Sequence, residues 1–131
     1  KFFRKITKNR DKTTKILKVK GRKIEIINFY EKVAKFDFNE LCDRNLGSED
    51  YISISSNCDF IFIENLPDFT ENNSNQQQRF ITLIDIIYEK KIPLMITSET
   101  NLGSIKSSKS MVEPFKRTIS RLYELTSKDY K

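Results

Sequence analysis

The chain has 131 residues and a formal net charge of +6, and 37% of its residues are hydrophobic. This length suits a single domain with a moderate core, and ten phenylalanines argue against a disordered chain. The absence of histidine excludes a Ser-His-Asp triad, a Cys-His pair and a histidine-ligated zinc site.

The start of the chain and its cysteines bear on the class of protein. The first residues are too charged for a signal peptide or a membrane span, and we expect a cytoplasmic protein. Because the first residue is not methionine, we treat the chain as a fragment of a longer protein. Cys42 and Cys58 have no CxxC partner, so we expect both to be reduced packing residues and no metal site to form.

The positive charge is concentrated at the start. Residues 1–23 carry eleven Lys and Arg against the single Asp11, which leaves thirteen basic and seventeen acidic residues in 24–131. A basic end on an acidic body is typical of contact with nucleic acid or an anionic membrane. The alternative is a pair of strands with one solvated lysine face, which the shortage of interleaved aromatic residues favours.

The first predicted elements are strands. Residues 15–26 alternate apolar and charged side chains around Gly21, which predicts a β-hairpin with its turn at residues 20–22. The next segment predicts a short strand with Val33 and Phe36 facing inward. We therefore expect a basic hairpin and strand region over residues 1–38.

An α/β region is expected over residues 39–131. Asp37 and Glu40 match a capping box ahead of a short helix, and a second short helix follows Gly47. A nearly continuous apolar run then predicts a strand over 58–64 that is covered on both faces.

A βαβ unit is completed by the following segments. Apolar residues at helical spacing predict a helix over 74–90, opened by a capping box of Ser74 and Gln77. A second apolar strand is expected over 92–97. Such a unit predicts two parallel strands joined by a right-handed crossover.

The last predicted helix spans 112–127, with Pro114 in its first turn. We expect it to cover one face of the small sheet while the helix over 74–90 covers the other. Between them, the Gly/Ser/Lys-rich residues 101–111 predict a mobile surface loop.

Three arginines are the candidate functional residues. The sequence contains no GxxxxGK[ST] phosphate loop, and Glu64 at a strand end therefore makes only a weak case for a magnesium-binding acid. Arg79 begins the central helix, and Arg117 and Arg121 lie one turn apart on the last helix. They form either local ion pairs, Glu113 with Arg117 and Arg121 with Glu124, or a site for a phosphoryl group.

Four segments together resemble one known family. They are FDFNELCDRNLGSEDYISIS, FIFIENLPDF, QRFITLIDIIYEKKIPLMITSE and FKRTISRLYELTSKDY, in the family's order and spacing. On these residues the chain resembles the ZapE-type P-loop ATPases, whose eukaryotic relatives are the mitochondrial AFG-one-like or lactation-elevated proteins. Two departures are Gln78, where the family usually has a second arginine, and Leu125, where it commonly has methionine.

The resemblance implies the C-terminal third of an AAA+-related ATPase. Such a protein binds ATP and Mg²⁺ through motifs in the preceding two-thirds, so this chain alone is expected to bind neither and to lack ATPase activity. Arg79, Arg117 and Arg121 would then reach a nucleotide held by the upstream P-loop region of the same subunit, or of a neighbour in a homo-oligomer. One arginine would sense the γ-phosphate and another would act as a finger.

A rival interpretation is a non-enzymatic module that recognises a protein client, or a partner associated with division or the membrane. The candidate surface for this partner is the basic hairpin. Nucleic-acid binding by the same hairpin is the third interpretation, and it ranks below the other two. The resemblance implies a role in bacterial cell division at the inner membrane face, or in mitochondrial protein quality control. The candidate partner surface consists of Lys15, Lys18, Lys20, Arg22 and Lys23.

Overall fold

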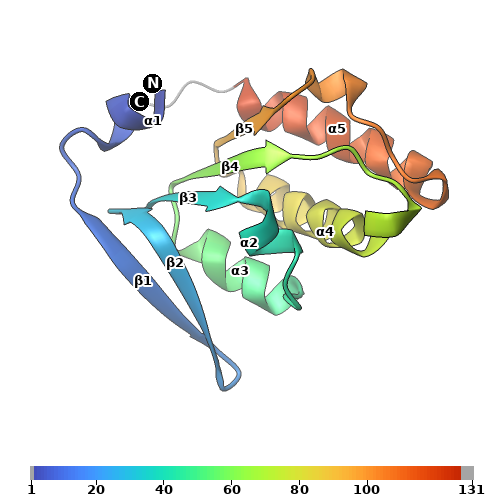
Figure 1. Cartoon of the computed structure of the whole chain (residues 1–131). Coiled ribbons are helices and arrows are strands. Elements are labelled where there is room, and N and C mark those ends of the chain that lie inside the picture. Colours follow the sequence, from blue (N-terminus) through green and yellow to red (C-terminus); the bar gives the residue numbers. More distant parts are fainter. Residues whose placement is uncertain (1, 128–131) are drawn as a thin grey trace.

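A computed structural model describes residues 2–127 of the chain. Five strands form one sheet, and five helices and three short 3₁₀ turns accompany it in that part of the chain (Figure 1). The elements in chain order are α1 (Phe2–Thr7), β1 (Lys12–Val19), β2 (Arg22–Tyr30), β3 (Val33–Asp37), α2 (Phe38–Cys42), α3 (Ser48–Ser56), β4 (Phe60–Leu66), η1 (Glu71–Asn73), α4 (Ser74–Lys90), β5 (Leu94–Ser98), η2 (Leu102–Ser104), η3 (Lys109–Met111) and α5 (Val112–Thr126).

The strands follow one another across the sheet in the order β1-β2-β3-β4-β5. Neighbours are antiparallel from β1 to β3 and parallel from β3 to β5. The predicted α/β class is therefore confirmed, with an N-terminal hairpin, a βαβ unit made of β4, α4 and β5, and a C-terminal helix. Because β3 pairs with both β2 and β4, the N-terminal strands and the βαβ unit share one sheet.

The hairpin turn lies where the alternation predicts it. Val19 pairs with Arg22, and the two residues between them, Lys20 and Gly21, have φ angles of 46° and 81°. Positive φ at both central positions is the geometry that matches the right-handed twist of a two-residue hairpin, and glycine adopts it without steric cost. The register shifts between Thr13 and Lys15, where β2 carries one extra residue.

The main core lies on one face of the sheet. Its buried residues come from the inner face of every strand and from α2, α3, α4 and α5, and include Ile61, Ile84 and Leu122. The expectation that the last helix covers the opposite face from α4 is wrong. α5 lies on the same face of the sheet as α4, since its Phe115, Leu122 and Leu125 are part of the main core.

The opposite face is covered by α1, a helix that the sequence did not predict. Phe3 packs edge-on against Tyr30 and Phe62, with ring centroids 5.0 and 4.8 Å apart. Val33 and Phe60 are buried in the same small cluster. The apolar character of β4 on both faces is thus explained, because one face meets the helices and the other meets α1.

Capping explains where the early helices begin. Asp37 and Glu40 form the predicted capping box of α2: Asn39 donates to Asp37 at 3.1 Å, and the Asp37 amide donates to Glu40 at 2.8 Å. At α3 the carboxylate of Asp50 accepts a 2.7 Å hydrogen bond from the amide of Gly47. The predicted box at α4 is wrong, because Gln77 is buried and bonds elsewhere.

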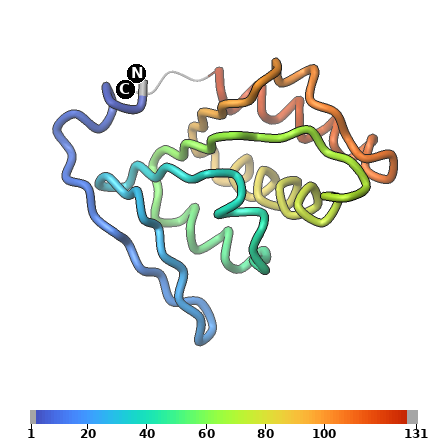
Figure 2. Tube along the Cα trace, in the orientation of Figure 1, coloured from blue at the N-terminus to red at the C-terminus, as the bar shows by residue number. Residues whose placement is uncertain are grey.

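Gln77 instead holds the loop of residues 101–111 against α4. Its amide donates to the Ser107 hydroxyl at 2.7 Å, and its carbonyl oxygen accepts from the Ser108 hydroxyl at 2.7 Å. The amide of Lys106 donates to Asp68 at 2.8 Å, so the segment after β4 and this loop run side by side (Figure 2). A loop expected to be mobile is therefore tethered by polar side chains that its composition does not reveal.

Candidate functional site

The three candidate arginines come from two helices that lie parallel, side by side. Asp85 of α4 contacts Arg121 of α5, and one turn further along both helices Tyr88 contacts Glu124. Both helices therefore begin at the same edge of the sheet, which is the edge where β4 and β5 end. This arrangement determines what each arginine can reach.

Arg79 is occupied within the chain. Its Nη1 donates a 3.0 Å hydrogen bond to the backbone carbonyl of Cys42, the last residue of α2. The last carbonyls of a helix have no partner within it, so a cationic donor there both satisfies one of them and complements the helix dipole. Arg79 thus joins α4 to α2, on a different flank of α4 from the one that faces α5.

Arg121 is also occupied. Its guanidinium donates to the carboxylate of Asp85 and lies over the ring of Tyr88, 4.6 Å from the ring centroid. The expected pair with Glu124 does not form, because Glu124 accepts a 2.8 Å hydrogen bond from the Tyr88 hydroxyl. That hydrogen bond raises the pKa of Tyr88, since it stabilises the protonated phenol.

Arg117 differs from both. It is exposed on α5, and within residues 2–127 it forms no hydrogen bond or ion pair. Its expected partner Glu113 instead pairs with Lys116 at 3.2 Å. The structure therefore does not bring the three arginines to one point, and Arg117 is the one whose guanidinium is available to an external anion.

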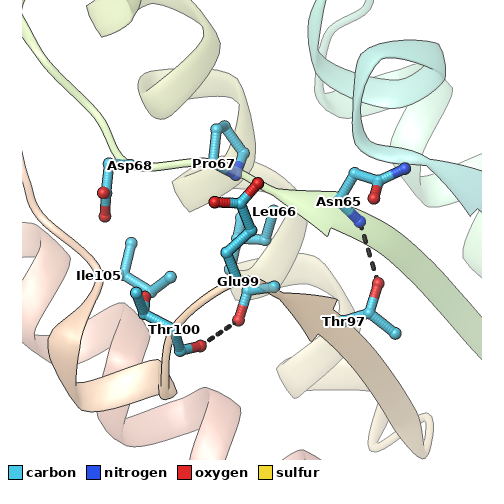
Figure 3. Close-up of a pocket in the computed structure, with 9 residues that line it drawn as sticks. Asn65, Leu66, Pro67, Asp68, Thr97, Glu99, Thr100 and Ile105 are labelled. Atoms are coloured by element: carbon cyan, nitrogen blue, oxygen red, sulfur yellow. Dashed lines mark hydrogen bonds between the residues drawn. The ribbon is translucent and has the colours of Figure 1, made fainter.

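A pocket lies at the carboxyl ends of β4 and β5, with a volume of about 420 Å³ (Figure 3). Ligands of open α/β sheets bind outside the carboxyl ends of the strands, so this is the expected place for a site. None of the three arginines lines it. Its lining consists of Asn65, Leu66, Pro67, Asp68, Thr97, Ser98, Glu99, Thr100 and Ile105.

Asn65 shapes the mouth of this pocket. Its φ of 64° is left-handed, a conformation that asparagine tolerates better than most residues. Its amide N–H donates to the Thr97 hydroxyl at 3.0 Å, and its side chain donates to Asp37 at 2.6 Å. The pairing of β4 with β5 becomes irregular at this point, between Ile63 and Leu66, and the ends of three parallel strands are thereby linked.

The charge of the pocket limits its chemistry. Asp68 and Glu99 line it and no Lys or Arg does, so it suits hydrogen-bond donors and cations rather than a phosphate group. Glu64 at the end of β4 pairs with Lys35 at 3.4 Å instead of remaining free. Among residues 2–127 no group of three acidic, Cys or His side chains could hold a metal ion.

Sequence reasoning did not identify Asn65, Asp68, Thr97 and Glu99 as a group. The signal was available, because each follows or ends a strand of the predicted βαβ unit, and such strand ends converge. What the sequence could not show was the bulge at Asn65, which turns its side chain towards Asp37.

The candidate partner surface is divided by the structure. Lys20 pairs with Glu49 and Arg22 with Asp50, each at 2.8 Å, so the hairpin turn is held on α3. Lys18 and Lys23 are exposed and lie directly opposite each other across the hairpin. Lys15 is half-buried on the side of the sheet that faces the helices, together with Leu17 and Val19.

Comparison with known protein families decides the class. The model of a family described as AFG1-like ATPase matches residues 1–131. The chain belongs to the AFG1-like ATPase family. The resemblance seen in the sequence is therefore confirmed.

Individual members of the AFG1-like ATPase family show the same relationship. Lactation elevated protein 1 homolog B from Danio rerio is 31% identical over 70% of this chain and 18% of its own length. Cell division protein ZapE from Escherichia coli K12 is 26% identical over 87% of this chain and 30% of its own length. An uncharacterized protein from Schizosaccharomyces pombe, C115.02c, is 30% identical over 68% of this chain and 20% of its own length.

This member of the AFG1-like ATPase family spans less than a third of the curated relatives that it matches. No solved structure matches the chain. None of the helices in residues 2–127 has the length and apolar character needed to cross a membrane.

Proposed function

We propose that the chain is the arginine-bearing part of an ATP-hydrolysing protein, and that Arg117 is the residue it supplies to the nucleotide. Membership of the AFG1-like ATPase family supports the reaction. The observation that supports the residue is the exposed guanidinium of Arg117, which has no partner in residues 2–127.

ATP and Mg²⁺ are held elsewhere in this proposal. The sequence contains no phosphate loop, and the pocket at the strand ends is acidic, so neither offers a place for a triphosphate. A P-loop region, in the same polypeptide or in a neighbouring subunit, binds the nucleotide. An arginine that reaches it stabilises the negative charge that develops on the transferring phosphoryl group.

Arg121 and Arg79 have different roles in this scheme. Arg121 is neutralised by Asp85 and stacked on Tyr88, so it fixes the surface of α5 one turn from Arg117. Arg79 secures α2 against α4 through the Cys42 carbonyl. Both act as positioning residues, and their removal affects folding as well as turnover.

The test is Arg117→Ala in the intact protein, with ATP turnover and nucleotide affinity measured separately. Turnover should fall by about 10³-fold or more, the scale of arginine-finger losses, while ATP affinity and the unfolding midpoint stay close to wild type. Lys116→Ala removes a neighbouring exposed cation from the same helix and is the matched control. Wild-type turnover in Arg117→Ala, or an equal loss in Lys116→Ala, overturns the assignment of Arg117.

A role in cell division is a second candidate, supported by the match to Cell division protein ZapE over 87% of the chain. In this proposal the protein acts in the bacterial cytoplasm, at the inner face of the membrane. Depleting it in its host should lengthen the cells, and re-expression should restore their length. Unchanged cell length after complete depletion would leave the ATPase proposal standing and remove this one.

A further inference from the structure

The outer edge of the sheet is formed by β1. This strand of eight residues pairs only with β2 within the described part of the chain, and no other backbone segment there bonds to it. An edge strand presents a row of unpaired N–H and C=O groups that another extended chain can complete. Figure 1 shows β1 as the outer strand of the hairpin, on the far side of β2 from β3.

Lysines follow this edge. Lys12, Lys15 and Lys18 lie on β1, and Lys18 faces Lys23 directly across the hairpin. Two like charges opposite each other on one face of a sheet destabilise the pair. An anionic side chain placed beside Lys18 relieves that repulsion, so the edge favours an acidic neighbour over a basic one.

Two exposed isoleucines accompany the lysines. The side chains of Lys12, Thr14, Ile16 and Lys18 alternate with the buried Leu17 and Val19 and therefore point to the outer face. Ile16 is 53% exposed, and the nearby Ile27 of β2 is 48% exposed. On that face, a strand added beside β1 would therefore lie next to the charged Lys12, the apolar Ile16 and the charged Lys18.

The hairpin is anchored at its turn. The ion pairs of Lys20 with Glu49 and of Arg22 with Asp50 fix the hairpin on α3. An edge that is ordered before binding loses less conformational entropy when a strand pairs with it, which favours binding by strand addition.

From these observations we propose that β1 is a docking edge for an extended acidic polypeptide segment, which adds to the sheet beside it as a further strand. The segment carries acidic residues opposite Lys12, Lys15 and Lys18, and an apolar residue opposite Ile16. A second copy of the same edge is a poor occupant, because it would place lysines against lysines. This inference does not depend on the ATPase function.

Other anionic partners fit this surface less well. Glu25 lies directly opposite Ile16, so a carboxylate stands in the middle of the face that a lipid surface would have to contact. The outer face of β1 carries no aromatic side chain on which a base could stack. A polypeptide can avoid Glu25, because it binds along the edge of β1 rather than on the face of the hairpin.

The experiment uses the intact protein and a labelled peptide of eight residues. The peptide carries glutamates opposite Lys12, Lys15 and Lys18 and a valine opposite Ile16 in antiparallel register. Fluorescence anisotropy measures binding, and amide hydrogen exchange locates it. Binding should weaken as salt rises, and exchange should slow in β1 while β5 is unaffected.

A matched peptide separates strand addition from simple charge attraction. N-methylation of its alternate amides, on the edge that faces β1, leaves every charge in place and removes the donors. It should weaken binding by more than about tenfold, because each lost hydrogen bond contributes to the ladder. Lys18→Ala should weaken the parent peptide about two- to fivefold. Lys90→Ala, which removes an exposed lysine at the end of α4, should have no effect.

Three results with the peptides would overturn the proposal. They are an absence of peptide binding at low salt, equal binding of the two peptides, and unchanged exchange in β1 when the peptide is bound. Vesicles of phosphatidylglycerol provide the membrane comparison. If they bind more tightly than the parent peptide and lose affinity in Lys18→Ala, the surface is a lipid contact instead.

Discussion

Arg22 donates a 2.8 Å hydrogen bond to the carboxylate of Asp50, whose side chain is only 1% exposed. The same carboxylate accepts the amide of Gly47 and so also caps α3. One buried charge thus serves the hairpin turn and the start of a helix, which lie far apart in the sequence. Loss of the guanidinium leaves that charge with a single donor.

We predict that Arg22→Ala lowers the free energy of unfolding by about 1–3 kcal/mol, the usual cost of leaving a buried polar group short of a partner. Urea denaturation measures the change. The comparison is Lys20→Ala, which removes the solvent-exposed pair with Glu49 and should cost less than about 1 kcal/mol. Equal effects of the two substitutions would show that the burial of Asp50 does not determine the strength of this contact.

Substitution of Arg121 and of Arg117 by alanine should change the free energy of unfolding by different amounts. Arg121→Ala removes the contact with Asp85 and the stacking on Tyr88, and we expect a loss of about 1–2 kcal/mol. Arg117→Ala should stay within about 0.5 kcal/mol of wild type, because surface changes without contacts have small effects. A destabilised Arg117→Ala protein would point to a contact outside residues 2–127.

Gln77→Ala should loosen the loop of residues 101–111. The substitution leaves the buried Ser108 hydroxyl and its amide without their acceptor, which costs about 1–3 kcal/mol. Hydrogen exchange at residues 105–111 should accelerate, and exchange in β1 should not. Gln78→Ala, an exposed neighbour, is the control and should leave both stability and exchange unchanged.

Neither cysteine should react in the folded protein. Burial raises the pKa of the Cys58 thiol to about 12 and raises that of Cys42 well above its usual value. The reactive thiolate appears only as the pH approaches the raised pKa, so a thiol reagent at pH 8 should modify neither residue. Both should react once the protein is unfolded in guanidinium. Rapid modification of the folded protein at pH 8 would contradict the burial of these thiols.

The regular parts of the fold followed from periodicity alone. The hairpin alternation, the apolar strands and the helical spacing in residues 74–90 each reflect a dominant local pattern, and the observed bounds of the later elements lie within about two residues of the expected ones. The helix that covers the second face of the sheet could not be predicted from periodicity. A helix as short as α1 has too few residues for a periodic signal, and its role follows from tertiary contacts such as those of Phe3 with Tyr30 and Phe62.

The sequence also did not predict the polar contacts between segments that lie far apart in the chain. Ser74 and Gln77 have the spacing of a capping box, but Gln77 makes a more fully buried set of hydrogen bonds with Ser107 and Ser108. Similarly, the acidic neighbours of Lys20 and Arg22 lie on another helix, and nothing in the alternation of the hairpin indicates them. Local spacing identifies which residues can bond, whereas the fold determines their partners.

The packing of α1 also sets an order of assembly. Its Phe3 rests on Phe62 of β4, and Met95 of β5 borders the same small cluster. During synthesis α1 therefore leaves the ribosome long before the surface that receives it exists, since β4 and β5 come much later in the chain. Docking of α1 during synthesis must therefore wait until β4 and β5 have been made.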